Sequence, residues 1–220
     1  MVLANDSDPE GQALAISAVS NAPGDATISH NGTTVSFTGG ASFASTGINT
    51  FTYTISDGHG GQANGEVVVY RNANASWRAS QFGVNASNPA VAGDDADPNH
   101  NGIPNIIEYA LGGDPSGGST GTSISPQGSR NAVSNCMQLS FTRLLDRNDI
   151  TLTVQASESL TGTWENLAQS VNGAAFTSLL SGVEVSETGI GNARAVTVCD
   201  RYSMTDSAHP RRFLRLEVTQ

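Results

Sequence analysis

Apolar and polar residues alternate with a period of two in several short runs along the first third of the chain. The apolar positions that share a face within these runs are Leu14, Ile16, Ala18, Val35, Phe37, Phe51, Tyr53 and Ile55. Glu66–Tyr70 ends the series, and Asn-Gly, Gly-Gly and Asp-Gly pairs lie between the runs. Alternation with regular turns is typical of short antiparallel strands in a β-sandwich. We therefore expect a β-sandwich domain over residues 1–70.

Between residues 71 and 118 the pattern changes to helical spacing. Residues 77–82 predict a short helix that Ser76 would cap, and residues 106–111 predict a second that Gly112-Gly113 ends. A polar loop over residues 85–102 separates the two, and residues 117–121 have the composition of a flexible linker. This segment, 71–118, is therefore expected to be a helical connector.

Period-two runs return over residues 119–220. Their alternating apolar positions are Met137, Leu139, Phe141, Ile150, Leu152 and Val154, with later runs at 183–185, 195–199 and 213–218. Asp146–Asp149 supplies a turn between the first two runs. The predicted fold is mainly β, with two antiparallel β-sandwich domains joined by a short helical segment.

Composition and charge restrict the partners of such a protein. Only 37% of the 220 residues are hydrophobic and 6% are aromatic, which favours small, turn-rich domains. The net charge is −10, and every basic residue is Arg. This balance argues against nucleic acid or an anionic membrane as a partner and favours divalent cations.

Membrane insertion and an export signal are also not expected. No run approaches the roughly 18 consecutive apolar residues of a spanning helix. Ala13–Val19 follows Asp6, Asp8 and Glu10 and not a basic segment, so it predicts a strand. We expect the chain to carry no signal peptide of its own.

The sharpest chemical motif is Asp97–Glu108, which fits the spacing D-x-[DN]-x-[DN]-G-x5-E of an EF-hand calcium loop. Calcium takes about six to eight oxygen ligands, and alternate side chains of such a loop can converge on one ion. Gly102 would permit the sharp turn, and His100 is expected to face solvent. The candidate metal ligands are Asp97, Asn99, Asn101, the carbonyl of Ile103, Asn105 and the carboxylate of Glu108.

Only Asp97 and Glu108 carry formal charge among these ligands, so we expect weak binding. A Kd of about 10⁻⁴–10⁻³ M is typical of extracellular modules. The alternative is an Asn/Asp-rich turn that only caps the following helix.

Two further groups of residues leave alternatives open. Asp6, Asp8 and Glu10, which Asp57 could approach, would form another calcium site or a solvated acidic turn. Cys136 and Cys199 lie in predicted strands and could form a disulfide or remain two buried thiols.

Enzyme motifs are weak in this sequence. No metal-protease spacing or nucleophile elbow is present, and the aromatic content is too low for a sugar-cleaving cleft. Trp77 and Trp164 lie among apolar neighbours, so both are expected in cores. We do not expect an enzyme.

Three stretches resemble modules of exported bacterial proteins. Residues 2–11 and 49–61 resemble cadherin-like, Ig-like tandem repeats, of which this chain would be truncated at its N-terminus. Residues 77–115 are similar to thrombospondin type 3-like or dockerin-like calcium loops, with Asn99 and Asn101 in place of two Asp. Residues 136–220 resemble the C-terminal β-domain that often follows such loops.

The resemblance implies a non-enzymatic, calcium-binding structural or adhesion module of an extracellular or cell-surface bacterial protein. Its partner would be another protein or a cell-surface glycan. Strand complementation between copies would give filaments if a truncated sandwich left an open edge. The alternative is an accessory carbohydrate-binding module of a secreted polysaccharide-active enzyme.

Overall fold

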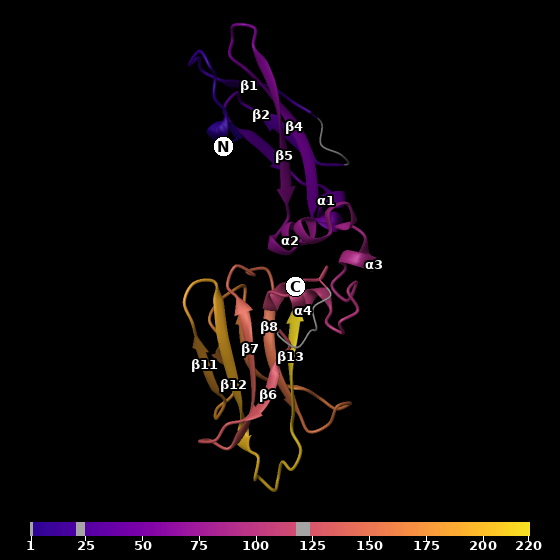
Figure 1. Ribbon diagram of the computed structural model, residues 1–220, viewed down its shortest axis with the longest axis vertical. Helices are drawn as coiled ribbons and strands as arrows, with labels where there is room; N and C mark the ends of the chain where they lie inside the picture. The colour runs from indigo at the N-terminus through magenta and orange to yellow at the C-terminus, as the bar shows by residue number, and fades with distance from the viewer. Residues whose placement is uncertain (1, 21–24, 118–123) are drawn as a thin grey trace. The chain divides into compact units, whose positions relative to one another are not determined.

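The computed structural model describes residues 2–20, 25–117 and 124–220. The chain forms two compact units, Met1–Ser76 and Trp77–Gln220. Antiparallel strands make up most of the regular structure, so the chain is mainly β, as the alternating pattern predicted (Figure 1). Most of the predicted linker at 117–121 lies outside the described residues.

The first unit combines a three-stranded sheet with a two-stranded hairpin. The sheet order is β1-β4-β5, and β2 pairs with β3. Phe37 of the hairpin stacks on Phe51 of the sheet. The elements of this unit are η1 (Val2–Asn5), β1 (Ala15–Val19), β2 (Thr27–His30), β3 (Val35–Thr38), α1 (Ala41–Thr46), β4 (Ile48–Ser56) and β5 (Gln62–Tyr70).

Most of the alternating positions in this unit face its core. Ile16, Tyr53 and Ile55 form a buried cluster. Ala18 is the exception, because the pairing of β1 with β4 shifts register between Ile16 and Ala18. Val19 therefore packs against the cluster, and the expectation that Ala18 shares the face of Ile16 is wrong.

Short helices follow this sheet along the chain. They are α2 (Ala73–Phe82), η2 (Gly83–Asn85), α3 (Pro89–Ala92) and α4 (Asn105–Leu111). The prediction that Ser76 caps the first helix is wrong, because α2 begins three residues earlier. The Asn72 side chain accepts a hydrogen bond from the Ala75 amide at 2.9 Å, which satisfies a free amide of the first turn. Gly112 ends α4 in a left-handed conformation, as predicted.

The second unit contains two four-stranded antiparallel sheets. One has the order β10 (Thr177–Ser178), β9 (Glu165–Val171), β8 (Thr151–Ser157), β13 (Phe213–Thr219). The other has the order β11 (Glu184–Thr188), β12 (Ala193–Ser203), β7 (Cys136–Leu144), β6 (Gln127–Arg130). Buried apolar side chains from both sheets form the core, among them Leu152, Val154, Val196 and Val198.

A fully buried arginine joins the two sheets. Arg143 of β7 pairs with Glu187 of β11 at 2.6 Å and donates to the Ser170 hydroxyl of β9 at 3.1 Å. Its guanidinium also lies over the Phe176 ring, 5.4 Å from the ring centre. A buried charge is tolerated only when it is paired and hydrogen-bonded, and Arg143 meets both conditions.

The two tryptophans have different environments. Trp77 is 8% exposed and contacts Phe82 and Tyr109, in agreement with the core position expected for it. Trp164 is only half-buried, and the Arg215 guanidinium covers its ring at 4.2 Å. The core position expected for Trp164 is therefore wrong, because its ring packs under a guanidinium group and stays partly exposed.

Candidate metal centre

The loop before α4 is closed by hydrogen bonds from its own side chains. The Asp97 carboxylate accepts from the amides of Asn101 at 3.1 Å and Gly102 at 2.8 Å. Asn101 Oδ1 accepts from the Ile103 amide at 2.7 Å. Gly102 has a φ of 82°, in the left-handed region that glycine adopts without strain. The turn predicted at Gly102 is therefore present.

Three of the predicted ligands gather around the carboxylate of Glu108. Asn101 Nδ2 donates to Glu108 Oε1 at 3.0 Å, and Asn99 Nδ2 approaches the same oxygen at 3.4 Å. Asp97 lies near enough for its charge to raise the pKa of Glu108. The loop thus brings Asp97, Asn99 and Asn101 to the first turn of α4.

Glu108 itself is in an unusual environment for a carboxylate. The residue is 1% exposed, and Oε2 is buried without a hydrogen-bond partner among the described residues. Burial is the largest cause that raises its pKa, and the charges of Asp114 and Asp97 raise it further. The hydrogen bonds from Asn101 and Asn99 lower this pKa. A cation at this position would stabilise the ionised form.

The two remaining predicted ligands are Asn105 and Ile103. Asn105 donates from Nδ2 to the carbonyls of Val91 and Gly93, both at 2.9 Å, and its Oδ1 is buried without a partner among the described residues. Its amide therefore holds the preceding loop, while its oxygen remains an unused acceptor. Ile103 follows Gly102 and is 7% exposed. His100 is exposed, as expected.

One neighbour of the centre was not among the predicted ligands. Asp114 follows α4, and its backbone carbonyl accepts from Asn99 Nδ2 at 3.0 Å. Its side chain accepts from the Ser116 hydroxyl and amide, which lowers the pKa of Asp114. The sequence signal for it was the Asp-Pro pair that ends the calcium-loop resemblance.

This donor set fits a calcium ion better than a softer metal. No group of three or more His, Cys, Asp or Glu side chains that could hold a metal occurs in the described part of the chain. The centre instead combines two carboxylates with side-chain amides, and hard cations such as calcium accept both kinds of oxygen. A side-chain amide carries one oxygen and one nitrogen, so rotation of Asn99 and Asn101 would present Oδ1 to an ion.

The residue after Glu108, Tyr109, anchors α4 to the turn between β7 and β8. Tyr109 is fully buried, and its hydroxyl donates to Asp149 Oδ1 at 2.5 Å. Arg147 donates to the Tyr109 carbonyl at 3.1 Å and lies over the Tyr109 ring at 4.7 Å. Burial is the main cause that raises the pKa of Tyr109. Through Tyr109, the helix that carries Glu108 is thus attached directly to the β7–β8 turn.

The second acidic cluster comes together only in part. Asp8, Glu10 and Asp57 line one cleft of about 240 Å³ in the first unit. Asp8 accepts from two backbone amides of its own turn, and Asp57 accepts from two of the β4–β5 turn, which lowers the pKa of Asp57. Asp6 instead accepts from the Tyr53 hydroxyl at 3.0 Å. The carboxylates of Asp6, Asp8 and Asp57 therefore accept hydrogen bonds from groups within the first unit.

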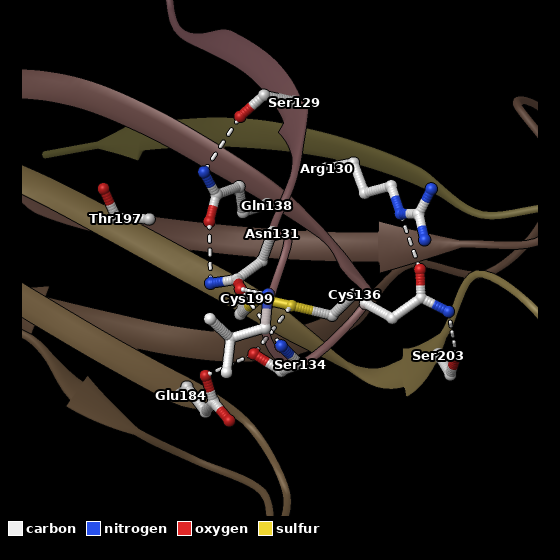
Figure 2. Close-up of a disulfide and its surroundings, with 12 residues drawn as sticks. Ser129, Arg130, Asn131, Ser134, Cys136, Gln138, Glu184, Thr197, Cys199 and Ser203 are labelled. Atoms are coloured by element: carbon white, nitrogen blue, oxygen red, sulfur yellow. Dashed lines mark hydrogen bonds between the residues drawn. A yellow bond between two sulfur atoms is a disulfide. The ribbon is translucent and has the colours of Figure 1, made fainter.

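The cysteines form a disulfide between neighbouring strands of one sheet. Cys136 of β7 is bonded to Cys199 of β12, with their Cα atoms 5.9 Å apart (Figure 2). Of the two alternatives left open by the sequence, the structure therefore has the bridge. The Ser134 hydroxyl donates to Glu184 at 3.0 Å beside it, which ties the β6–β7 turn to β11.

A comparison with protein families bears on the first unit. Residues 1–70 match the bacterial Ig domain family. The Ig-like repeat expected there is thus supported, and the match ends before the metal centre and the C-terminal sheets. Neither a curated protein nor a solved structure matches the chain. No helix among the described residues is long and apolar enough to cross a membrane.

Proposed function

We propose that this chain is a non-enzymatic, calcium-stabilised structural or adhesion module of an exported bacterial surface protein. The match of residues 1–70 to a bacterial Ig domain supports a surface role. The disulfide between Cys136 and Cys199 is in keeping with an oxidising compartment outside the cytosol.

The observation that carries the calcium assignment is the buried, unpartnered oxygen of Glu108. A buried carboxylate oxygen without a partner among the described residues costs free energy, and a bound cation would remove that cost. Asp97, Asn99, Asn101 and Glu108 would hold the ion, and the carbonyl of Ile103 and the side chain of Asn105 would complete the ligand set. The ion would supply positive charge and order, and no reaction is assigned to it.

Calcium binding would stabilise the second unit through α4. Glu108 and Tyr109 are consecutive, so fixing the Glu108 carboxylate also fixes the helix that presents Tyr109 to Asp149 and Arg147. The expected affinity is weak, with a Kd of about 10⁻⁴ M or above. Such a site fills at the millimolar calcium concentrations found outside cells.

Isothermal titration with calcium chloride tests this proposal. Binding is expected for the native chain and not for Glu108→Gln, which replaces a bidentate anionic ligand with a neutral amide. Asp95→Asn is the matched control, because Asp95 is exposed and its replacement removes the same charge close to Asp97. Equal heats for Glu108→Gln and the native chain would refute the assignment.

A further inference from the structure

In Figure 1 the β8–β9 turn and the loop from β12 to β13 lie at the end of the second unit away from α4. Residues of both segments line a cleft of about 370 Å³. We name it the loop-end cleft. Its volume falls within the range of about 300–1,000 Å³ that small-molecule sites occupy. The charged and aromatic residues that line it are Glu158, Glu165, Arg201, Tyr202, His209 and Arg212.

Two structural features shape this cleft. The pairing of β12 with β7 shifts register between Cys199 and Ser203, which places Arg201 and Tyr202 in an irregular segment beside the disulfide. A contact between His209 Nδ1 and Glu158 joins the β12–β13 loop to the β8–β9 turn. A polar contact therefore joins the two walls of the cleft, and the disulfide fixes the start of the irregular β12 segment to β7.

Charged groups in the cleft are matched in pairs. Arg212 binds the buried carboxylate of Asp200 through Nε at 2.6 Å and Nη2 at 3.0 Å. Arg201 pairs with Glu165 at 2.6 Å. An anionic ligand would meet these carboxylates, and a cationic ligand would meet the guanidinium groups. The pairing therefore favours a neutral ligand.

Donors and acceptors lie side by side in these pairs, which suits hydroxyl groups. A hydroxyl both donates and accepts, whereas a guanidinium only donates and a carboxylate only accepts. Among the described residues, neither the Tyr202 hydroxyl nor His209 Nε2 has a hydrogen-bond partner, and both residues line the cleft. A compound with several adjacent hydroxyl groups can satisfy such a surface.

The aromatic part of the cleft is packed before any ligand binds. The Tyr202 and His209 rings stack with centres 3.6 Å apart. The guanidinium groups of Arg201 and Arg212 lie over the Tyr202 ring at 4.7 and 5.0 Å. Planar groups packed in this way lose little conformational entropy on binding, which favours affinity for a small polar ligand.

We propose that the loop-end cleft binds a neutral saccharide. The saccharide adds a class of partner to the proposed surface function. The cleft proposal rests on that function only for the extracellular location of the protein. The residues assigned to calcium lie at the opposite end of the second unit, so the ion takes no part in the cleft. Sugar binding is therefore expected to be the same in calcium and in EDTA.

Saturation-transfer NMR on the full chain tests the proposal. The probes are methyl glucoside, methyl galactoside, methyl mannoside, N-acetylglucosamine and xylose, with glucuronate and glucosamine as charged counterparts. We expect signal from at least one neutral sugar, with a Kd in about the millimolar range. The charged counterparts should bind more weakly. Absence of signal from every neutral sugar, or preference for a charged one, would overturn the proposal.

Variants locate the bound sugar. Tyr202→Ala should weaken binding by about tenfold or more, as expected for a central aromatic residue. Tyr202→Phe keeps the ring packing and removes one hydroxyl, so it should weaken binding by a smaller factor and tests the cleft even if the alanine variant does not fold. Val133→Ser is the control, because Val133 is 96% exposed in the β6–β7 turn. Binding lost in Trp164→Ala but kept in both Tyr202 variants would place the sugar elsewhere and overturn the assignment.

Failure of this proposal is distinguishable from failure of the calcium proposal. Sugar binding without calcium binding would refute the metal assignment alone. Calcium binding without sugar binding would refute the cleft assignment alone.

Discussion

The ion pair between Arg143 and Glu187 offers a quantitative test of how the second unit is held together. Arg143 has a fully buried side chain, and that of Glu187 is 13% exposed. Glu187 Oε1 accepts from Nε and Nη2 of Arg143, and its Oε2 accepts from the Phe176 amide at 2.9 Å. Glu187→Ala therefore leaves a buried guanidinium without its counter-charge and a backbone amide without its acceptor.

Removing one member of a buried pair costs about 3–5 kcal/mol, far more than the net contribution of the intact pair. We expect Glu187→Ala to destabilise the second unit by this amount. The Ser170 hydroxyl and the Ala174 carbonyl still accept from Arg143, so the lower part of the range is the better estimate.

Urea unfolding followed by tryptophan fluorescence measures this effect. Both tryptophans, Trp77 and Trp164, belong to the second unit, so the signal reports on that unit. Asp146→Ala is the control, because Asp146 pairs with Arg147 while its side chain is 54% exposed. Exposed pairs contribute at most about 1 kcal/mol. A loss below about 1 kcal/mol for Glu187→Ala would refute the reasoning on burial.

Three further sets of substitutions test other contacts in the two units. Replacing both Cys136 and Cys199 by Ala should lower the stability of the second unit by roughly 4 kcal/mol, given their separation of 63 residues, and an unchanged urea midpoint would contradict this. Tyr109→Phe should cost about 1–3 kcal/mol, because it removes a buried hydrogen bond to Asp149, and thermal unfolding measures the loss. Hydrogen bonds from the amides of Ser42 and Ala41 lower the pKa of Asp25, so its stabilising effect is present above the ordinary value of 3.8 and disappears as pH falls through the lowered pKa. Asp25→Asn should therefore destabilise the first unit at neutral pH but not at strongly acid pH, as measured by circular dichroism.

Local patterns predicted the strands well where alternation was regular. β4 alternates buried and less buried positions along much of its length, and this period was visible in the sequence. β2 and β9 were not predicted, because Thr27–His30 and Glu165–Val171 contain too many polar residues for a clear period. Their place in the fold is set by pairing with neighbouring strands.

The two sites differ in how far the sequence could predict them. The candidate metal centre lies within one short stretch of sequence, so the spacing of its residues was enough to predict that Asp97, Asn99, Asn101 and Glu108 come together. The loop-end cleft depends on residues from 158 to 212, whose proximity follows from strand order and the register shift in β12. No local pattern reports such an arrangement. The burial of Arg143 was equally hidden, because its partner Glu187 lies 44 residues away.

The most direct test of the calcium centre compares the native chain with Glu108→Gln in calcium and in EDTA at neutral pH. Burial raises the pKa of Glu108, so its ionised carboxylate destabilises the calcium-free fold. In EDTA the Gln variant should therefore be at least as stable as the native chain. In about 5 mM calcium the native chain should gain about 2 kcal/mol by mass action for a Kd near 10⁻⁴ M, and the variant should gain nothing. Calorimetric unfolding in which calcium stabilises the native chain and leaves Glu108→Gln unchanged supports the calcium centre, and an equal shift in both chains, or no shift in either, would contradict it.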